Sequence, residues 1–250
     1  MSHAQSLTQL FALDSLLEQE EIDIRDTVRK FGNEHIRPHV AQWFEEAKLP
    51  ARELAKELGQ LGVLGMHLDG YGCAGMSATA YGLACLELEA VDSGIRSLVS
   101  VQGSLAMFSI HHWGSEEQKQ EWLPRMAAGE AIGCFGLTEP DFGSNPAGMR
   151  TNAKRDGDDW ILNGTKMWIT NGSIADVAVV WAQTDLEEGA KASALRRPHR
   201  HPRFLRPGDP LQAVAARLGH LGARPRRRAS ARLGDDAEGQ GSARTADLPR

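Results

Sequence analysis

The chain has 250 residues, enough for one or two domains, and its 41% hydrophobic and 24% charged residues are typical of a soluble globular protein. No run approaches the roughly 18 apolar residues of a membrane span, and the N-terminus lacks the basic stretch and apolar core of a secretory signal. The three cysteines form no CxxC pair, which argues against a disulfide framework and leads us to expect a reducing, cytoplasmic location.

The first part of the chain, residues 15–130, is predicted to form an all-helical domain. Ile24, Val28 and Phe31 recur at helical spacing with charged residues between them, which indicates a helix with one apolar face. Pro38 is expected to kink or end that helix because it cannot donate a backbone hydrogen bond. Ser77, after a glycine-rich loop, is predicted to cap a later helix. Further helices are predicted over 51–62, 79–91, 95–110 and 115–129.

The pattern changes at residue 131. Short alternating or apolar runs follow one another, separated by the turn signals DFGSNPAG, DGDD, NG and NGSIAD. Strands are predicted over 132–139, 149–155, 159–164, 165–172 and 177–183. The fold class is therefore α+β, an all-helical domain followed by a small, incomplete antiparallel β domain over 131–185.

The remaining segment, residues 186–250, has a different composition. Residues 1–185 contain 14 Lys and Arg against 26 Asp and Glu, a net charge of −12. Residues 186–250 contain 14 Lys and Arg against 7 Asp and Glu, a net charge of +7. Ala, Arg, Gly and Pro make up 38 of these 65 residues, so the segment is predicted to be a disordered tail. Its basic run ARPRRRASAR would attract phosphate non-specifically. With one Phe for base stacking, no specific nucleic-acid partner is expected.

Three separated segments carry a family resemblance. GYGCAGMSATAYGLACLELEAVDSGIRSLVSVQGSLAM (70–107), GSEEQKQEWLPRMAAGEAIGCFGLTEPDFGSNPAGM (114–149) and DDWILNGTKMWITNGSIADVAVVWAQTD (158–185) resemble acyl-CoA dehydrogenases, most of all the glutaryl-CoA type, in family order and spacing. The resemblance covers residues 15–185 and implies an N-terminal helical domain (15–130) and part of a middle β domain (131–185). The tail (186–250) matches nothing in it. The implied activity is FAD-dependent α,β-dehydrogenation of an acyl-CoA thioester.

The resemblance implies a flavin site built from FGLTEPDFGS and TKMWITNG. Trp168 is expected on a strand that packs it against the isoalloxazine ring, with Thr170 donating a hydrogen bond near N5. Phe142 and Asn145 depart from the family's run. Read alone, LTEP favours an ordinary strand with a Pro-Asp turn, and a tryptophan in a strand is more often part of the core. The expected FAD-binding residues are Phe135, Gly136, Leu137, Thr138, Gly143, Ser144, Trp168, Ile169 and Thr170.

The resemblance also implies a substrate site at Glu89, Arg96, Ser97 and Ser144. In the glutaryl-CoA type, the Arg-Ser pair meets the free carboxylate of the acyl chain, which a guanidinium holds through two parallel hydrogen bonds. The alternative is a structural ion pair between Arg96 and Asp92 or Glu89. No metal site is expected, since His111 and His112 end an apolar helix and His199 and His201 lack further ligands.

Family members continue into a C-terminal helical bundle that carries the general-base glutamate. Neither Glu187 nor Glu188 matches it, so no catalytic residue is assigned. We hypothesise a frameshift after Asp185, and expect poor solubility, weak flavin retention and no turnover. The implied partners are the acyl-CoA substrate, an electron-transfer flavoprotein and further copies of the chain, with no membrane partner. The alternatives are an acyl-CoA- or flavin-binding remnant and an acyl-CoA oxidase relative.

Overall fold

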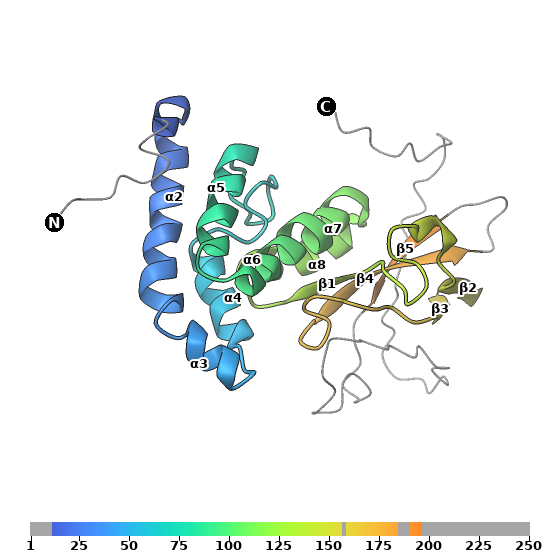
Figure 1. Ribbon diagram of the computed structural model, residues 1–250. Helices are drawn as coiled ribbons and strands as arrows, with labels where there is room; N and C mark the ends of the chain where they lie inside the picture. Colours follow the sequence, from blue (N-terminus) through green and yellow to red (C-terminus); the bar gives the residue numbers. More distant parts are fainter. Residues whose placement is uncertain (1–11, 157–158, 185–190, 197–250) are drawn as a thin grey trace.

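The computed structural model describes residues 12–156, 159–184 and 191–196, and shows a helical part followed by a small sheet (Figure 1). Glu187, Glu188, His199, His201 and residues 197–250 lie outside this described part. The helical region and the small sheet after it confirm the predicted α+β class.

The helical part follows the predicted pattern closely. The helices are α2 (Gln19–Phe31), α3 (Val40–Glu45), α4 (Ala51–Gln60), α5 (Ala78–Glu89), α6 (Ser93–Ser100), α7 (Phe108–Trp113) and α8 (Glu116–Ala127), with 3-10 helices η1 (Leu13–Leu16) and η4 (Pro146–Gly148) and π-helices η2 (Gly32–Ile36) and η3 (Val101–Met107). The continuous run from α2 through η2 ends at Ile36, two residues before Pro38, which has no amide hydrogen with which to extend the helical hydrogen bonds.

Side-chain caps fix where three helices begin. The Ala80 amide donates to Ser77 Oγ at 3.0 Å, which confirms the predicted cap of α5. Asp92 caps α6 in the same way by accepting from the Ile95 amide at 2.9 Å. At α8, Ser115 and Gln118 cap each other reciprocally. Asp92 thus serves as a cap, and Arg96 pairs with Glu89 instead.

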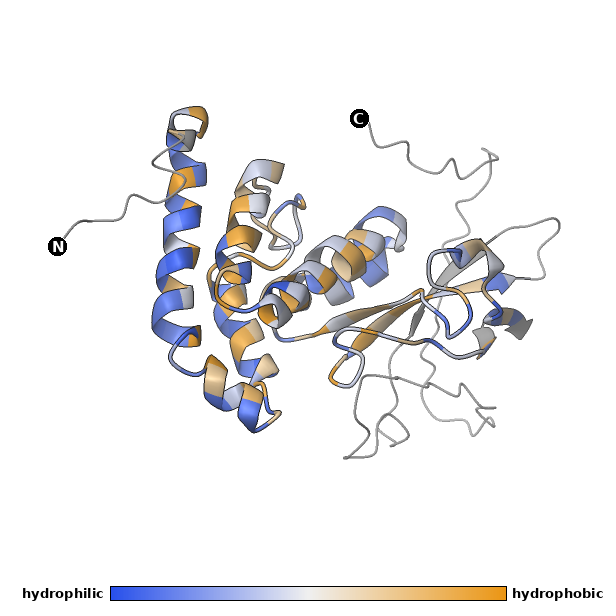
Figure 2. Cartoon of the chain, viewed as in Figure 1, coloured by the Kyte–Doolittle hydropathy of each residue, from blue (hydrophilic) through white to orange (hydrophobic). Residues whose placement is uncertain are grey.

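The helices bury two neighbouring apolar clusters. The first joins α2, α4, α5 and α6 around residues such as Val28, Leu58 and Ile95. The second joins η3, α7 and α8 to strands of the sheet. Figure 2 shows α2 as mainly hydrophilic with hydrophobic residues at intervals, as expected for a helix with one buried face.

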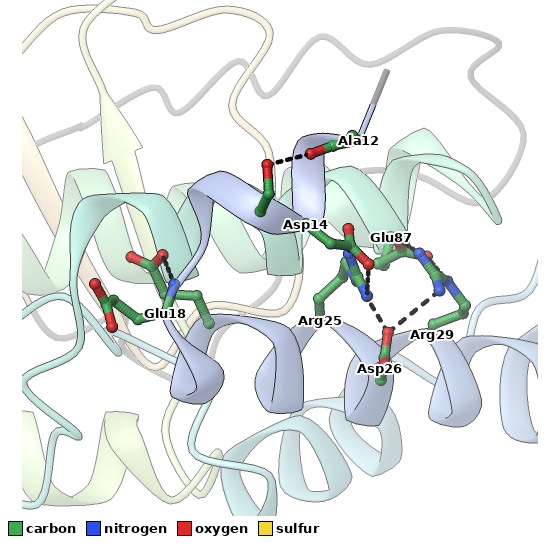
Figure 3. A network of polar contacts seen from close by, with 9 residues as sticks. Ala12, Asp14, Glu18, Arg25, Asp26, Arg29 and Glu87 are labelled. Carbon is green, nitrogen blue, oxygen red and sulfur yellow. Dashed lines mark hydrogen bonds and ion pairs between the residues drawn. The ribbon is translucent and has the colours of Figure 1, made fainter. Parts of the chain in front are cut away.

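An ion-pair network ties α2 to α5 (Figure 3). Arg29 donates from Nη2 to Glu87 Oε1 at 2.7 Å and from Nε to Glu87 Oε2 at 3.0 Å. Glu87 is buried, with 6% of its surface exposed. On the other side of Asp26, Arg25 pairs with Asp14. A two-bond pairing of this kind fixes the relative rotation of the helices as well as their distance.

The sheet is mixed, which differs from the antiparallel sheet that we predicted. Strand β4 is central because it pairs in parallel with both β1 and β2, and antiparallel with β5, while β2 and β3 form an antiparallel pair. The parallel pairing arises because the chain makes long connections before it returns to the sheet. The strands are β1 (Gly133–Gly136), β2 (Asn152–Asp156), β3 (Asp159–Asn163), β4 (Val177–Thr184) and β5 (Lys191–Arg196).

Two segments differ from the sequence prediction. Residues 165–172, predicted as a strand, form a turn in which Trp168 and Asn171 have positive φ angles of 61° and 64°. Strand β5 lies within the segment predicted to be disordered, where it pairs with β4. A six-residue strand that completes a sheet edge needs little apolar content of its own, because backbone hydrogen bonds carry the pairing.

Polar side chains connect the helical part to the sheet. Gln102, 1% exposed, donates to the carbonyls of Met126 and Ala131 and accepts from the Gly133 amide. Arg52 of α4 pairs with Asp176 at 2.9 Å, just before β4. These contacts place the start of β1 and β4 directly against the helices, and so position the residues that follow both strands.

Candidate functional site

The two segments predicted to face a flavin lie side by side. The Met167 amide donates to the Thr138 carbonyl at 2.9 Å, and Lys166 Nζ donates to the Leu137 carbonyl at 2.9 Å. Leu137 and Thr138 directly follow β1, so the strand delivers them to the 165–172 turn. The structure therefore brings FGLT and KMWIT together, although the second is a turn.

A buried ion pair lies at this junction. Lys166 Nζ contacts Glu139 Oε1 at 2.8 Å, and both side chains are 5% exposed. Burial alone would raise the pKa of Glu139, but hydrogen bonds from Lys166 and from the Arg150 and Thr151 amides outweigh it and lower the pKa to about 2. Burial lowers the pKa of Lys166, and Glu139 partly offsets that shift. Glu139 is thus ionised at neutral pH, and its carboxylate accepts from Lys166 and from the Arg150 and Thr151 amides.

The 165–172 turn presents Trp168 to the outside. Its side chain is among the exposed large hydrophobics, at 54%, and its φ of 61° is unusual for a bulky residue. Three residues later, Asn171 Nδ2 donates to the Gly133 carbonyl at 3.2 Å and to the Leu98 carbonyl at 3.5 Å. Ile169 and Thr170 lie between these two points, and the Gly172 amide donates to the Ile169 carbonyl. The turn is therefore anchored at both ends.

Phe135 and Gly136 lie within β1 beside the central strand. The Phe135 ring contacts Trp181 edge-to-face, with centroids 6.0 Å apart. The Trp181 Nε1 atom is buried and has no hydrogen-bond partner among the described residues. A β-carbon at Gly136 would lie 3.4 Å from Lys166 Cγ, an ordinary van der Waals distance, so the lysine stem packs beside this strand.

Gly143 and Ser144 lie apart from this junction. They are exposed residues of the 140–148 loop, in which Arg150 stacks over the Phe142 ring at 5.3 Å. Within the described ranges, no hydrogen bond joins either residue to the 165–172 turn or to Arg96. The structure therefore does not bring these two predicted residues to the others.

Arg96 forms the ion pair that we weighed as the structural alternative. Its Nε donates to Glu89 Oε2 at 2.6 Å, and its Nη1 to Ser100 Oγ at 3.2 Å. The hydrogen bond that Arg96 donates to Glu89 raises the pKa of Arg96 further. The Arg96 side chain stays 36% exposed and that of Glu89 47% exposed, so the guanidinium has both an internal partner and access from outside. Ser97 is half-buried on the same helix.

Helix α6, which carries Arg96, contacts the turn through its backbone. Leu98, two residues after Arg96, supplies one of the carbonyls that Asn171 contacts, and Asn171 directly follows Thr170. Predicted substrate and flavin residues thus come from elements in direct contact.

Sequence reasoning missed four residues of this arrangement: Lys166, Asn171, Ser100 and Trp181. The signal for Lys166 was present, since a single lysine stands among the apolar and hydroxyl residues of TKMWIT. Ser100 follows Arg96 by four residues, the spacing at which helical side chains meet.

The residues present fit a flavin rather than a metal. The hydroxyls of Thr138, Ser144 and Thr170 have no hydrogen-bond partner in the described part of the chain and are at least partly exposed. The hydroxyls of Thr138 and Thr170 and the exposed Trp168 ring supply polar groups and an aromatic surface at one junction. The unpartnered Trp181 N–H lies beside Phe135 of β1, the strand that leads into this junction. Among the described residues, no group of three or more His, Cys, Asp or Glu could hold a metal ion. No helix in that part combines the length and apolar character of a membrane span.

Comparison with known families gives two matches. Residues 18–130 match the family described as acyl-CoA dehydrogenase, N-terminal domain, and residues 134–220 match acyl-CoA dehydrogenase, middle domain. The second match continues past Asp185, where we placed the end of the resemblance, and its last part lies outside the described residues.

Individual relatives agree with these matches. A glutaryl-CoA dehydrogenase structure from Mycobacterium smegmatis is 67% identical with a TM-score of 0.73, covering 76% of this chain and 48% of that one. A second structure of the enzyme, in complex with FADH2, is 69% identical, with the same TM-score and coverage. The mitochondrial long-chain specific acyl-CoA dehydrogenase of Sus scrofa is 38% identical over 77% of this chain and 44% of its own length. A structure titled as the electron transferring flavoprotein of Acidaminococcus fermentans is 35% identical with a TM-score of 0.69, covering 73% of this chain and 49% of that one. The chain thus spans about half the length of the relatives that it matches.

Proposed function

Since the chain belongs to the acyl-CoA dehydrogenase family through its N-terminal and middle domains, we propose that it supplies the flavin-facing and acyl-end residues of an FAD-dependent oxidoreductase that introduces an α,β double bond into glutaryl-CoA. The observation that carries this proposal is the junction at which Thr138 and Met167 are hydrogen-bonded beside the helix that holds Arg96. The high identity to glutaryl-CoA dehydrogenase supports the choice of substrate.

FAD, when bound, would accept the hydride that leaves the β-carbon of the acyl chain. Thr138 and Thr170 offer free hydroxyls to hold the flavin ring, and the Trp168 ring offers a surface against which it packs. Closing this surface would exclude water and so strengthen the polar contacts. No described residue is assigned as the base that removes the α-proton.

Arg96 would select a dicarboxylic acyl chain. Its Nε and Nη1 are used by Glu89 and Ser100, and its Nη2 has no intramolecular acceptor in the described part of the chain. A substrate carboxylate would share the guanidinium with Glu89, whose negative charge opposes it. Ser97 lies on the same helix and would add a hydroxyl donor for the incoming carboxylate, whereas the Ser100 hydroxyl already donates to the Ser97 carbonyl.

FAD titration of the purified chain tests the flavin half of the proposal. We expect the visible absorption bands of the flavin to shift and to co-elute with the protein in gel filtration, and Thr170→Val to weaken binding. The proposal would be contradicted if all the FAD eluted after the protein, with unshifted absorption bands.

Ligand perturbation of the bound flavin tests the acyl half. We expect glutaryl-CoA to shift the flavin bands at lower concentration than butyryl-CoA, and Arg96→Gln to abolish that preference. Arg37→Gln, at an exposed arginine of the helical part, is the matched control and should keep it.

The electron acceptor of the whole protein is proposed to be an electron-transfer flavoprotein. The match to a structure titled as such a protein supports this choice. The test of this proposal is to mix the protein with glutaryl-CoA and a purified electron-transfer flavoprotein. The absorbance of the electron-transfer flavoprotein then reports whether it is reduced.

A further inference from the structure

We propose that the buried Lys166–Glu139 pair positions the two flavin-facing segments relative to each other, and that it is retained for this geometry rather than for stability. The proposal rests on the flavin site proposed above. It makes Lys166 and Glu139 positioning residues, since neither is argued to touch the flavin.

The first support is the connectivity of the pair. Lys166 Nζ donates to both Glu139 Oε1 and the Leu137 carbonyl. Glu139 in turn accepts from the Arg150 amide at 2.6 Å and the Thr151 amide at 2.9 Å. One carboxylate therefore fixes both ends of the 139–151 loop, and one ammonium group fixes that loop to the turn. Lys166 contacts the Leu137 carbonyl and the Glu139 carboxylate, and Thr138 lies between these two residues in the sequence.

The second support is energetic. Removing two charges from water is expensive, and replacing a buried ion pair by apolar residues of similar volume is often neutral or stabilising. With both side chains 5% exposed, this pair adds little net stability. The pair does fix the relative orientation of the two segments, because a hydrogen-bonded pair tolerates only a narrow range of geometries.

The third support is the strained residue that follows. A bulky side chain at positive φ costs about 1–3 kcal/mol and persists only where its surroundings determine it. Trp168 has a φ of 61°. Lys166 and Met167 anchor the backbone on one side of it, and Asn171 on the other. Releasing the Lys166 anchor would let Trp168 relax to negative φ and so change the direction of its ring.

Paired substitutions separate positioning from stability. Lys166→Met and Glu139→Gln each leave one buried charge without its partner, so each should lower the urea midpoint. The double variant K166M/E139Q removes both charges, and its midpoint should return close to that of the unmodified chain. Its dissociation constant for FAD should nevertheless stay about tenfold higher or more, as when supporting residues around a site are lost. Lys154→Met, at an exposed lysine of β2 in the same sheet, is the control and should change neither quantity.

Hydrogen exchange without FAD gives a second readout. In the double variant, the amides of residues 165–172 should exchange faster than in the unmodified chain, while those of β4 keep their protection. Unchanged exchange, or an unchanged FAD dissociation constant, would overturn the positioning role. If the unmodified chain binds no FAD yet the exchange difference appears, the proposed function fails while the pair's control of the turn stands.

Discussion

At the scale of single residues, the backbone strain at Trp168 can be measured against a tryptophan in a relaxed conformation. Trp168 and Trp113 are similarly exposed, at 54% and 58%, but Trp113 ends helix α7 and its ring contacts those of Phe108 and His112. We expect Trp168→Gly to leave the free energy of unfolding within about 1 kcal/mol of its original value, because relief of strain offsets lost contacts.

Trp113→Gly should be less stable than Trp168→Gly by about 1 kcal/mol or more, because it loses ring contacts and places glycine in a helix. Urea unfolding followed by circular dichroism measures both variants. Equal losses for the two would show that the positive φ at Trp168 carries no strain.

The three thiols offer a second prediction at this scale. Burial raises the pKa of Cys73 to about 11 and that of Cys134 to about 12, and it also raises the pKa of Cys85. Because the thiolate is the reactive form, we expect the folded chain to react slowly with iodoacetamide at pH 8 and faster as the pH rises toward these values. Mass spectrometry counts the modified sites, and all three should react in 8 M urea, taken as roughly the concentration that unfolds small proteins.

At the scale of elements, two helical glycines should respond to the same substitution with opposite signs. A β-carbon at Gly59 in α4 would lie 2.5 Å from the Ala128 backbone, whereas one at Gly82 in α5 meets nothing within 4 Å. Gly59→Ala should lower the free energy of unfolding by about 2 kcal/mol or more through overpacking at the end of α8.

Gly82→Ala should instead raise the free energy of unfolding by about 0.5–1 kcal/mol, because alanine restricts the unfolded chain and favours the helix. Thermal unfolding of the two variants side by side checks the pair. A destabilised G82A would indicate that a surface outside the described residues packs on α5.

The helices and four of the strands were predictable from local signals, but the parallel pairing of the strands was not. Ser77, Ser115 and the apolar spacing around Val28 act within one turn of chain, so the sequence displays them directly. The 165–172 turn was mistaken for a strand because Trp, Ile and Thr favour strands. What overrides that preference is the burial of Lys166 against Glu139, 27 residues away in the sequence.

At the scale of the whole molecule, stability should fall in acid. Folding lowers the pKa of Glu139 from 4.5 to about 2, and lowers the pKa of Asp176, whose burial is outweighed by Arg52 and the Ile132 amide. A lowered folded pKa gives stability that is present above the unfolded value and lost as the pH falls toward the folded one. For Glu139 the loss by pH 3 is about 2 kcal/mol.

Urea unfolding at pH 7 and pH 3 measures this loss, which Glu139→Gln should reduce. Glu34→Gln, at an exposed carboxylate, serves as the comparison and should behave like the original chain. If E139Q shows the full loss between the two pH values, other carboxylates govern the acid response.

The arrangement of the site was predictable only in part. Motif order placed Thr138, Thr170 and Arg96 on elements that do meet, since three separated motifs constrain one another. Ser144 does not lie at the junction, because the stacking of Arg150 on the Phe142 ring holds the 140–148 loop elsewhere. Contacts such as Asn171 with Gly133 depend on how the helical part sits on the sheet, which no local pattern encodes.

The parallel pairing of β1 with β4 has a consequence for how the chain acquires its structure. Gly133 is opposite Val177, so the sheet cannot close until the whole intervening segment has been synthesised, and distant pairings of this kind form slowly. The helices rely on local contacts and can form while the ribosome is still adding residues. Until β4 has been synthesised, the edge of β1 that pairs with it stays unpaired. A chaperone that binds short apolar strands could bind β1 during that interval.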